Sequence, residues 1–201
     1  MNALNFGLYV GGKGQTTDRT GLSAVHTPDA VGRWQPLAHA TLIDQIDSAL
    51  GELKMRIVND TYKLDKDGQR MFGLLQIANC KSDSDFSFVA GVRNGHDRMI
   101  RAGLSVGLGV MVCSNLQFRG EIVIGTKHTL NIMDRLPLLI AGAVGQLATK
   151  WDGESVRVQN YKEQGLTESE GHDLIIQAAR ADVFPRSQVM DIVDEWKSPR
   201  H

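Results

Sequence analysis

The chain has 201 residues, of which 42% are hydrophobic and 22% charged, the composition of an ordinary globular protein. Its formal net charge of −1 excludes the strongly basic proteins that coat nucleic acid with their whole surface, so any nucleic-acid site must be a local patch. No signal peptide and no apolar run near the ~20 residues that a bilayer requires is visible, which predicts no contact with a membrane and a place in the cytoplasm.

Residues 1–36 are predicted to form a flexible arm. They are rich in Gly, Thr and Asp, as in "GGKG" and "TDRTG", and have no lasting hydrophobic periodicity. The stretch "GLYVGGKGQT" nearly matches a phosphate-binding loop, but Gly14 stands where that loop needs a Ser or Thr hydroxyl for Mg²⁺. A Gly-rich arm therefore explains these residues better than a nucleotide site.

One helix and about five strands are predicted to follow the arm. In "LAHATLIDQIDSALGEL", residues 37–53, apolar residues recur at helical spacing. The runs "KMRIVNDTYKL" and "RMFGLLQIANC" are predicted strands of a β-hairpin closed at Asp67 and Gly68. The third, fourth and fifth strands are "DFSFVAGVRN", "GLGVMVC" and "FRGEIVIGTKHT". Cys80 and Cys113 each end an apolar run and are predicted to be buried, reduced thiols.

The rest of the chain is predicted to be helical. Apolar residues from Ile132 to Leu147 form one stripe, in which Pro137 starts or kinks the main segment. The sequence "TESE" at 167–170 matches a capping box before a second helix, and a last helix carries Trp196 on its apolar stripe.

This order of elements predicts an α+β fold, because strands and helices are segregated along the chain. We expect one N-terminal helix, about five mostly antiparallel strands and a helical C-terminal part. The expected divisions are a flexible arm over residues 1–36, a core domain over 37–150 and a helical appendage over 151–201.

Signals for bound cofactors and for nucleophilic catalysis are weak. Gly103, Gly107 and Gly109 lack the strand–glycine–helix order of a dinucleotide-binding fold, and close backbone packing or a bulge explains them better. Ser105 and Ser114 lack the motif of an activated nucleophile. The sequence therefore predicts no cofactor and no catalytic residue.

A divalent-metal site is the next alternative. His96, Asp97 and His128, with Asp134, carry the right donor atoms, but they lack the ligand spacings that are typical of metal sites. We therefore expect no metal.

Basic side chains gather in the turn "GVRNGHDRMIRAG", residues 91–103, and at the ends of the third and fifth predicted strands. If these strands are near neighbours, their ends form one rim, where arginine forks, amide groups and backbone N–H groups can bind phosphate oxygens. The alternative is that Arg93 and Asp97 pair with each other and hold the turn. The predicted nucleic-acid or anion-binding residues are Arg93, Asn94, His96, Arg98, Arg101, Arg119, Lys127 and His128.

Five ordered segments together resemble the phage- and plasmid-encoded proteins grouped as domain of unknown function 932: "FGLLQ", "GVRNGHDR", "GLGVMVCSN", "FRGEIVIGTKHT" and "EWKSPRH". The resemblance runs from about Leu37 to the C-terminus. Gly95 and Ser114 stand where members commonly have Ser and Asp, which weakens an enzymatic interpretation. Members also continue past "EWKSPRH", so we expect a short or truncated member with apolar surface exposed near Trp196.

The resemblance implies a protein carried by a phage or a plasmid. We expect a non-enzymatic protein that binds nucleic acid, above all single-stranded DNA, as a homo-oligomer in the cytoplasm of a bacterial host. One alternative is an anti-defence inhibitor that binds a host protein, which needs no basic charge. The second alternative is a metal-dependent nuclease that uses His96, Asp97 and His128. An aromatic content of only 6% does not favour single-strand binding, which relies on base stacking.

Overall fold

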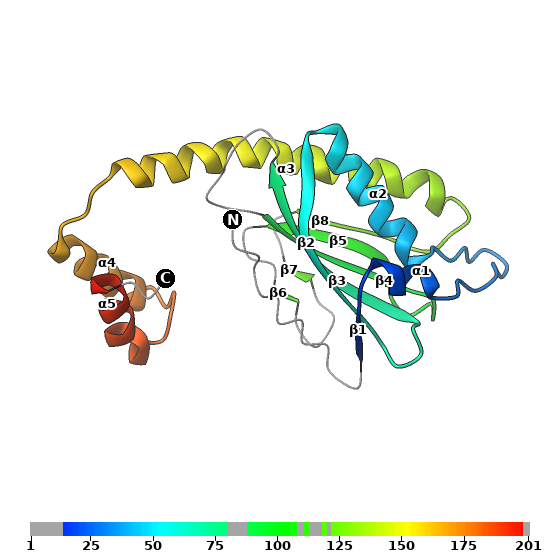
Figure 1. Cartoon of the computed structure of the whole chain (residues 1–201), viewed down its shortest axis with the longest axis horizontal. Coiled ribbons are helices and arrows are strands. Elements are labelled where there is room, and N and C mark those ends of the chain that lie inside the picture. The colour runs from blue at the N-terminus through cyan, green and yellow to red at the C-terminus, as the bar shows by residue number, and fades with distance from the viewer. Residues whose placement is uncertain (1–13, 80–87, 108–110, 113–117, 120–121, 199–201) are drawn as a thin grey trace. The chain divides into compact units, whose positions relative to one another are not determined.

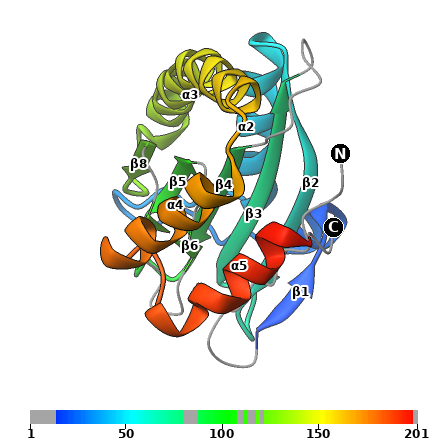
Figure 2. The same ribbon diagram turned by 90° about the vertical axis from the view of Figure 1, so that its left-hand side faces the viewer.

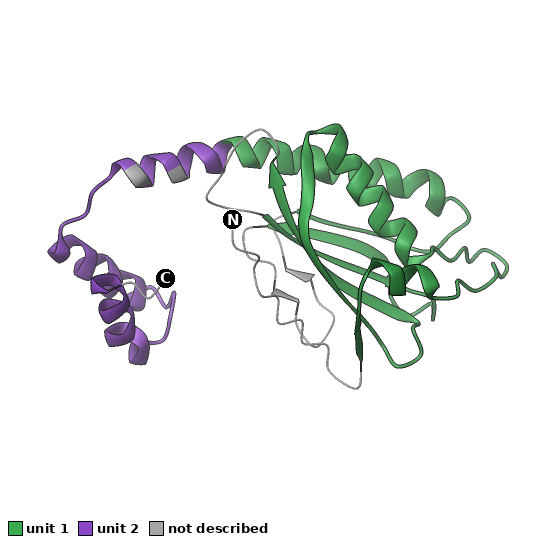
Figure 3. Ribbon diagram, in the orientation of Figure 1, with its two compact units in different colours: residues 1–152 green, residues 153–201 purple. Residues whose placement is uncertain are grey.

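The computed structural model describes residues 14–79, 88–107, 111–112, 118–119 and 122–198. The chain divides into two compact units, residues 1–152 and residues 153–201 (Figure 3). Residues 7–13 of the near phosphate-binding loop, Cys80, Cys113 and Ser114 lie outside the described residues, so the predictions made for them stay predictions.

The first unit is built on one antiparallel sheet. Its six strands lie side by side in the order β1 (Gln15–Thr17), β2 (Met55–Leu64), β3 (Arg70–Asn79), β4 (Phe88–Gly95), β5 (Ala102–Gly107) and β8 (Ile122–Thr126). A separate antiparallel pair consists of β6 (Met111–Val112) and β7 (Phe118–Arg119). The predicted α+β class is confirmed, with six strands in the main sheet where about five were expected.

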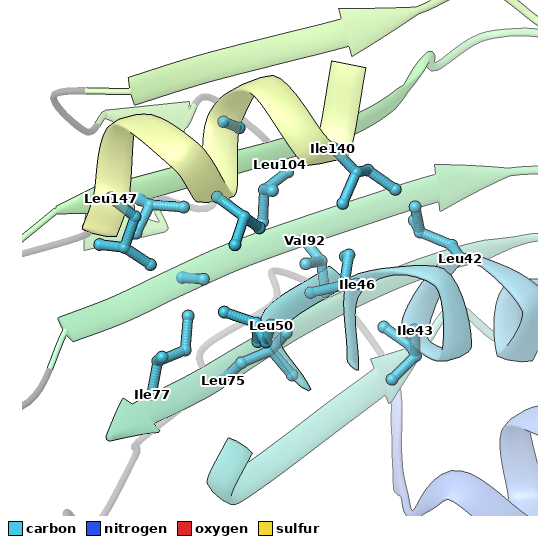
Figure 4. Close-up of a cluster of buried hydrophobic side chains, with 14 of the residues drawn as sticks. Leu42, Ile43, Ile46, Leu50, Leu75, Ile77, Val92, Leu104, Ile140 and Leu147 are labelled. Atoms are coloured by element: carbon cyan, nitrogen blue, oxygen red, sulfur yellow. The ribbon is translucent and has the colours of Figure 1, made fainter. Parts of the chain in front are cut away.

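Two helices cover one face of this sheet (Figures 1 and 2). They are α2 (His39–Glu52) and the first part of α3 (Ile132–Glu163). Their apolar stripes pack against inward-facing residues of the strands to form the core, as Figure 4 shows. Its labelled members are Leu42, Ile43, Ile46, Leu50, Leu75, Ile77, Val92, Leu104, Ile140 and Leu147.

The predicted hairpin is present as β2 and β3. Gly68 in its turn has a φ of +67°, a backbone conformation that glycine adopts without strain. The alternate residues of β3 are buried on both faces of the sheet, Leu75 and Ile77 on the helical face and Phe72 and Leu74 on the other. Burial on both faces explains why "MFGLLQIA" is an unbroken apolar run.

Residues 15–24, which the sequence assigns to a flexible arm, form β1 and α1 (Arg19–Ala24). The strand pairs with β2 at the sheet edge, and the Asp18 side chain caps α1 by accepting the Gly21 N–H at 2.8 Å. Arg19 donates to Asp47 at 2.9 Å and to Asp60 at 2.7 Å, which ties α1 to α2 and β2. Elements of three and six residues are too short for a periodic pattern, so their order depends on these tertiary contacts.

The fourth strand also lies elsewhere than predicted. The main sheet uses β5, "AGLSVG", rather than the segment "GLGVMVC" that follows it. A Cβ atom on Gly103 would lie 3.3 Å from the Arg93 Nε and 3.3 Å from the Ile124 carbonyl oxygen, so this glycine allows close packing within the sheet. Gly103 and Gly107 are part of β5, whereas Gly109 lies outside the described residues.

The second unit contains the end of α3 and a helical hairpin of α4 (Glu168–Arg180) and α5 (Val189–Lys197), with a short 3₁₀ turn (Arg186–Gln188) before α5. The predicted capping box is present: Thr167 Oγ1 accepts the Glu170 N–H, and the Glu170 carboxylate accepts the Thr167 N–H at 2.8 Å. The long helix begins at Ile132, so Pro137 lies inside it rather than at its start.

In the described part of the chain, every helix is too short or too polar to span a bilayer.

Gly73 supplies a test of the packing between neighbouring strands of the sheet. A Cβ atom there would lie 2.6 Å from the Tyr62 ring and 2.8 Å from a Val92 methyl group. We expect Gly73→Ala to lower the free energy of unfolding by about 1–3 kcal/mol, because the buried Tyr62 must move. Urea unfolding measures this, with Gly125→Ala as the control, since its Cβ would meet only the Ala102 carbonyl oxygen at 3.6 Å. Equal midpoints for the two variants would contradict the expectation.

Candidate functional site

The turn between β4 and β5 has a fixed conformation. The Asp97 carboxylate accepts the Met99 N–H at 3.0 Å and pairs with the Arg70 side chain, and the His96 N–H donates to the Gln69 carbonyl at 2.7 Å. Arg98 has a φ of +64°, which is uncommon outside glycine, and the bonds of Asp97 to Met99 and Arg70 hold this conformation. The alternative considered from the sequence was that Asp97 pairs with Arg93. In the structure, Asp97 pairs with Arg70 and thereby anchors the turn on the neighbouring hairpin.

This turn forms one wall of a pocket of about 420 Å³, which we call the cationic pocket. Three exposed cationic side chains line it, and no Asp or Glu is among its described lining residues. The lining residues are Trp34, Arg98, Met99, Ile100, Arg101, Lys127, His128 and Thr129. The strand ends that the sequence suggested as one rim therefore do meet here.

Trp34 reaches the pocket because the chain before α2 lies against the segment after β8. Trp34 forms isolated bridges with Val31 and Thr129, and the Gln35 N–H donates to the His128 carbonyl at 3.2 Å. The Arg98 guanidinium carbon lies 4.7 Å from the centroid of the Trp34 ring, which is the geometry of a cation–π contact. Trp34 thus places an aromatic face among the cationic groups.

Behind the pocket lies a buried polar group that we call the histidine cluster, made of His39, Asn94, His96 and His128. The Asn94 Nδ2 donates to the Leu37 carbonyl at 2.7 Å and to the His39 Nδ1 at 3.0 Å, and the Asn94 Oδ1 accepts from the His128 Nε2 at 2.8 Å. The His96 Nε2 also donates to the Leu37 carbonyl, at 2.9 Å. His39 and His96 are stacked, with ring centroids 4.1 Å apart.

These contacts fix the amide and the tautomers. A carbonyl oxygen only accepts, so the Leu37 carbonyl requires the NH₂ group of Asn94 and an N–H on the His96 Nε2. The amide then donates to His39, so the His39 Nδ1 is unprotonated and its Nε2 donates to the Gly68 carbonyl at 3.1 Å. All three rings therefore carry a proton on Nε2, and for His39 the contacts also require an unprotonated Nδ1.

Electrostatics keeps the cluster neutral. Burial, followed by the charge of His96, lowers the pKa of His39 to about 4. Burial also lowers the pKa of His96, although the Leu37 carbonyl and Asp97 oppose it, and lowers the pKa of His128. The positive charge of the site therefore comes from Arg98, Arg101 and Lys127 rather than from histidine.

The structure divides the predicted binding residues into groups. Arg98, Arg101, Lys127 and His128 line the cationic pocket, while Asn94 and His96 lie behind it in the histidine cluster.

The remaining two predicted residues are Arg93 and Arg119. Arg93 points to the opposite face of the sheet, because Val92 faces the helices and side chains alternate along a strand. Burial and then the charge of Arg101 lower the pKa of Arg93. The backbone of Arg119 belongs to β7, and its side chain lies outside the described residues.

In the part of the chain that the structure describes, no three His, Cys, Asp or Glu side chains lie close enough together to bind a metal ion. His96, Asp97, His128 and Asp134, the alternative ligands considered from the sequence, do not form such a group.

Sequence reasoning missed Trp34 and His39. Trp34 stands in "GRWQP", inside the stretch assigned to the arm, and His39 begins a helix whose pattern is explained by its apolar residues alone. The only available signal was the tryptophan itself, a large aromatic residue in an otherwise small and polar stretch.

Comparisons with known proteins found no match: no protein-family model, no curated protein and no solved structure is similar to this chain. The resemblance to domain of unknown function 932 therefore stays a prediction.

Proposed function

We propose that the first unit binds the phosphate backbone of a single-stranded nucleic acid, above all DNA, in the cationic pocket and without catalysis. One observation carries the proposal: Arg98, Arg101 and Lys127 converge on a pocket whose described lining contains no carboxylate. In a chain with a formal net charge of −1, such a local excess of positive charge attracts anions to this pocket. Arginine forks match the geometry of phosphate oxygens.

The aromatic face of Trp34 favours a single strand over a duplex. Sequence-tolerant binding of single strands combines a cationic groove with aromatic rings on which bases stack. The pocket supplies both features in about 420 Å³, the size range of small-molecule sites, so an unstacked nucleotide fits it. A base still stacked in a duplex lacks access to such a concave site.

The resemblance to proteins of phages and plasmids supports a role on incoming DNA. Binding as a homo-oligomer is part of the same proposal, and sedimentation velocity of the full chain with and without oligonucleotide measures it.

The first test is fluorescence anisotropy of a labelled poly-dT oligonucleotide at two salt concentrations, with duplex DNA as the competitor. We expect binding that weakens with salt and that unlabelled single strand displaces better than duplex. Absence of binding at low salt would overturn the proposal.

Arginine variants locate the site. Arg98→Ala and Arg101→Ala are each expected to weaken binding and to reduce the slope of log affinity against log salt concentration by about 0.7, the value for one phosphate contact of a single strand. Arg56→Ala is the matched control, because Arg56 is exposed on β2 and does not line the pocket. If both pocket variants keep the affinity and slope of the control, the pocket is not the site.

An anti-defence protein that binds a host protein is the second candidate. The observation that favours it is an exposed apolar groove in the second unit, lined by Ile175, Ile192 and Trp196 among others.

A further inference from the structure

The helical hairpin of the second unit carries a groove of about 690 Å³ that the proposed binding of nucleic acid does not use. Both α4 and α5 contribute to it, and we call it the hairpin groove. Its lining residues are Ile175, Gln188, Asp191, Ile192, Glu195 and Trp196.

Packing between α4 and α5 fixes the walls of the hairpin groove. The Trp196 ring lies directly on Gly171, where a Cβ atom would stand 2.7 Å from the indole Cε2, so only glycine allows this approach. Ile175 is 7% exposed and forms part of the floor, whereas Trp196 keeps 44% of its surface exposed. The groove therefore combines a fixed position with apolar surface that still faces solvent.

Apolar side chains are at least partly exposed along the whole of α5. None of its described residues is buried, although Val189, Ile192, Val193 and Trp196 form one amphipathic stripe. An apolar stripe left open on a fixed hairpin is typical of a surface that a partner covers.

Charge identifies the chemistry of that partner. Asp191 and Glu195 lie one helical turn apart on the groove wall, and no Lys or Arg is among the described lining residues. Residues 153–201 contain nine Asp or Glu and six Lys or Arg, so the unit as a whole is acidic.

We propose that the hairpin groove binds an amphipathic helix with basic flanks, supplied by a partner protein. Apolar side chains of that helix, spaced at i, i+3 or i+4, and i+7, fill the space beside Ile192 and Trp196, in the helix-in-groove mode of recognition. Lys or Arg side chains beside them pair with Asp191 and are attracted by the negative charge of Glu195.

A second copy of the hairpin fits less well than a basic helix. In a symmetric contact the same patch meets itself, so Asp191 and Glu195 of both copies would approach each other. Such like-charge contacts oppose association.

The test uses the full chain and two labelled 15-residue peptides. Both peptides carry Leu at helical spacing; one has Lys and the other Glu at the remaining positions. We expect fluorescence anisotropy to detect binding of the lysine peptide and none of the glutamate peptide. Equal binding of the two peptides, or no binding of the lysine peptide, would overturn the proposal.

Variants separate the groove from the general charge of the unit. The double change Asp191→Lys with Glu195→Lys is expected to weaken binding of the lysine peptide about tenfold. The matched control, Glu163→Lys with Asp173→Lys, alters the net charge equally at exposed positions outside the groove and is expected to change affinity less than about threefold. Equal losses in both double variants would overturn the site.

Ile192→Gln tests the apolar half, because glutamine keeps the helix propensity of α5 while removing apolar contact. We expect about a tenfold loss of peptide affinity with an unchanged far-ultraviolet circular dichroism spectrum. If instead the free protein forms a dimer that Ile192→Gln dissociates, the groove belongs to a second copy and the proposal is wrong. These variants leave the cationic pocket intact, so this proposal and that of nucleic-acid binding fail independently.

Discussion

Asn94→Ala is expected to lower the free energy of unfolding of the first unit by about 3–5 kcal/mol. The buried Asn94 side chain bonds to three partners at once, the Leu37 carbonyl, the His39 Nδ1 and the His128 Nε2. Alanine leaves the two histidine nitrogens without partners in a region closed to water, and each buried unsatisfied group costs about 1–3 kcal/mol. Lost packing around the missing amide adds to this.

Urea unfolding followed by tryptophan fluorescence measures the change. Gln69→Ala is the control, since the Gln69 side chain is exposed in the adjacent turn and only its backbone is hydrogen-bonded to Asp65 and His96. A loss below about 1 kcal/mol for Asn94→Ala would contradict the role assigned to the amide. We also expect weaker binding of poly-dT, because His128 both lines the cationic pocket and bonds to Asn94.

The part of the fold that local patterns determine was predictable. The hairpin of β2 and β3 follows from two apolar runs around a turn with glycine, and the capping box at Thr167 follows from four residues. Both depend on neighbours in sequence. Elements held by distant contacts, such as β1 and α1, were missed because three to six residues carry no period of their own.

The candidate site shows the same division. The basic turn containing Arg98 and Arg101 is visible in the sequence because its residues are neighbours. The Asn94 amide and the Leu37 carbonyl are 57 positions apart, and they meet only because α2 begins beside the end of β4. Nothing in the sequence near Trp34 points to Arg98. Composition predicts which groups a site contains, whereas the register of the sheet decides which of them meet.

Acid is expected to destabilise the first unit over the pH range between the usual pKa of histidine and the lowered pKa values of the histidine cluster. The pKa of His39 is lowered from 6.5 to about 4 by burial and then by the charge of His96. A histidine with a lower pKa in the folded state binds more protons when the protein unfolds, so stability falls as the pH drops. For His39 the stability is fully present above about pH 6.5 and is lost progressively down to about pH 4.

The size of this effect follows from the gap between the two pKa values, which corresponds to about 3 kcal/mol for His39 alone. The pKa values of His96 and His128 are lowered in the same direction, so they add to the loss over their own windows. One proton on the cluster also disfavours a second, because the rings are stacked or joined through Asn94.

Urea unfolding at several pH values between 4 and 7 measures this dependence. His39→Gln is expected to start from a lower stability and to lose less of it on acidification, since glutamine does not titrate. His172→Gln, in the second unit, serves as the control and is expected to keep the slope of the unchanged protein. A slope that His39→Gln leaves unaltered would assign the acid sensitivity to carboxylates instead, and the cluster would then have no part in it.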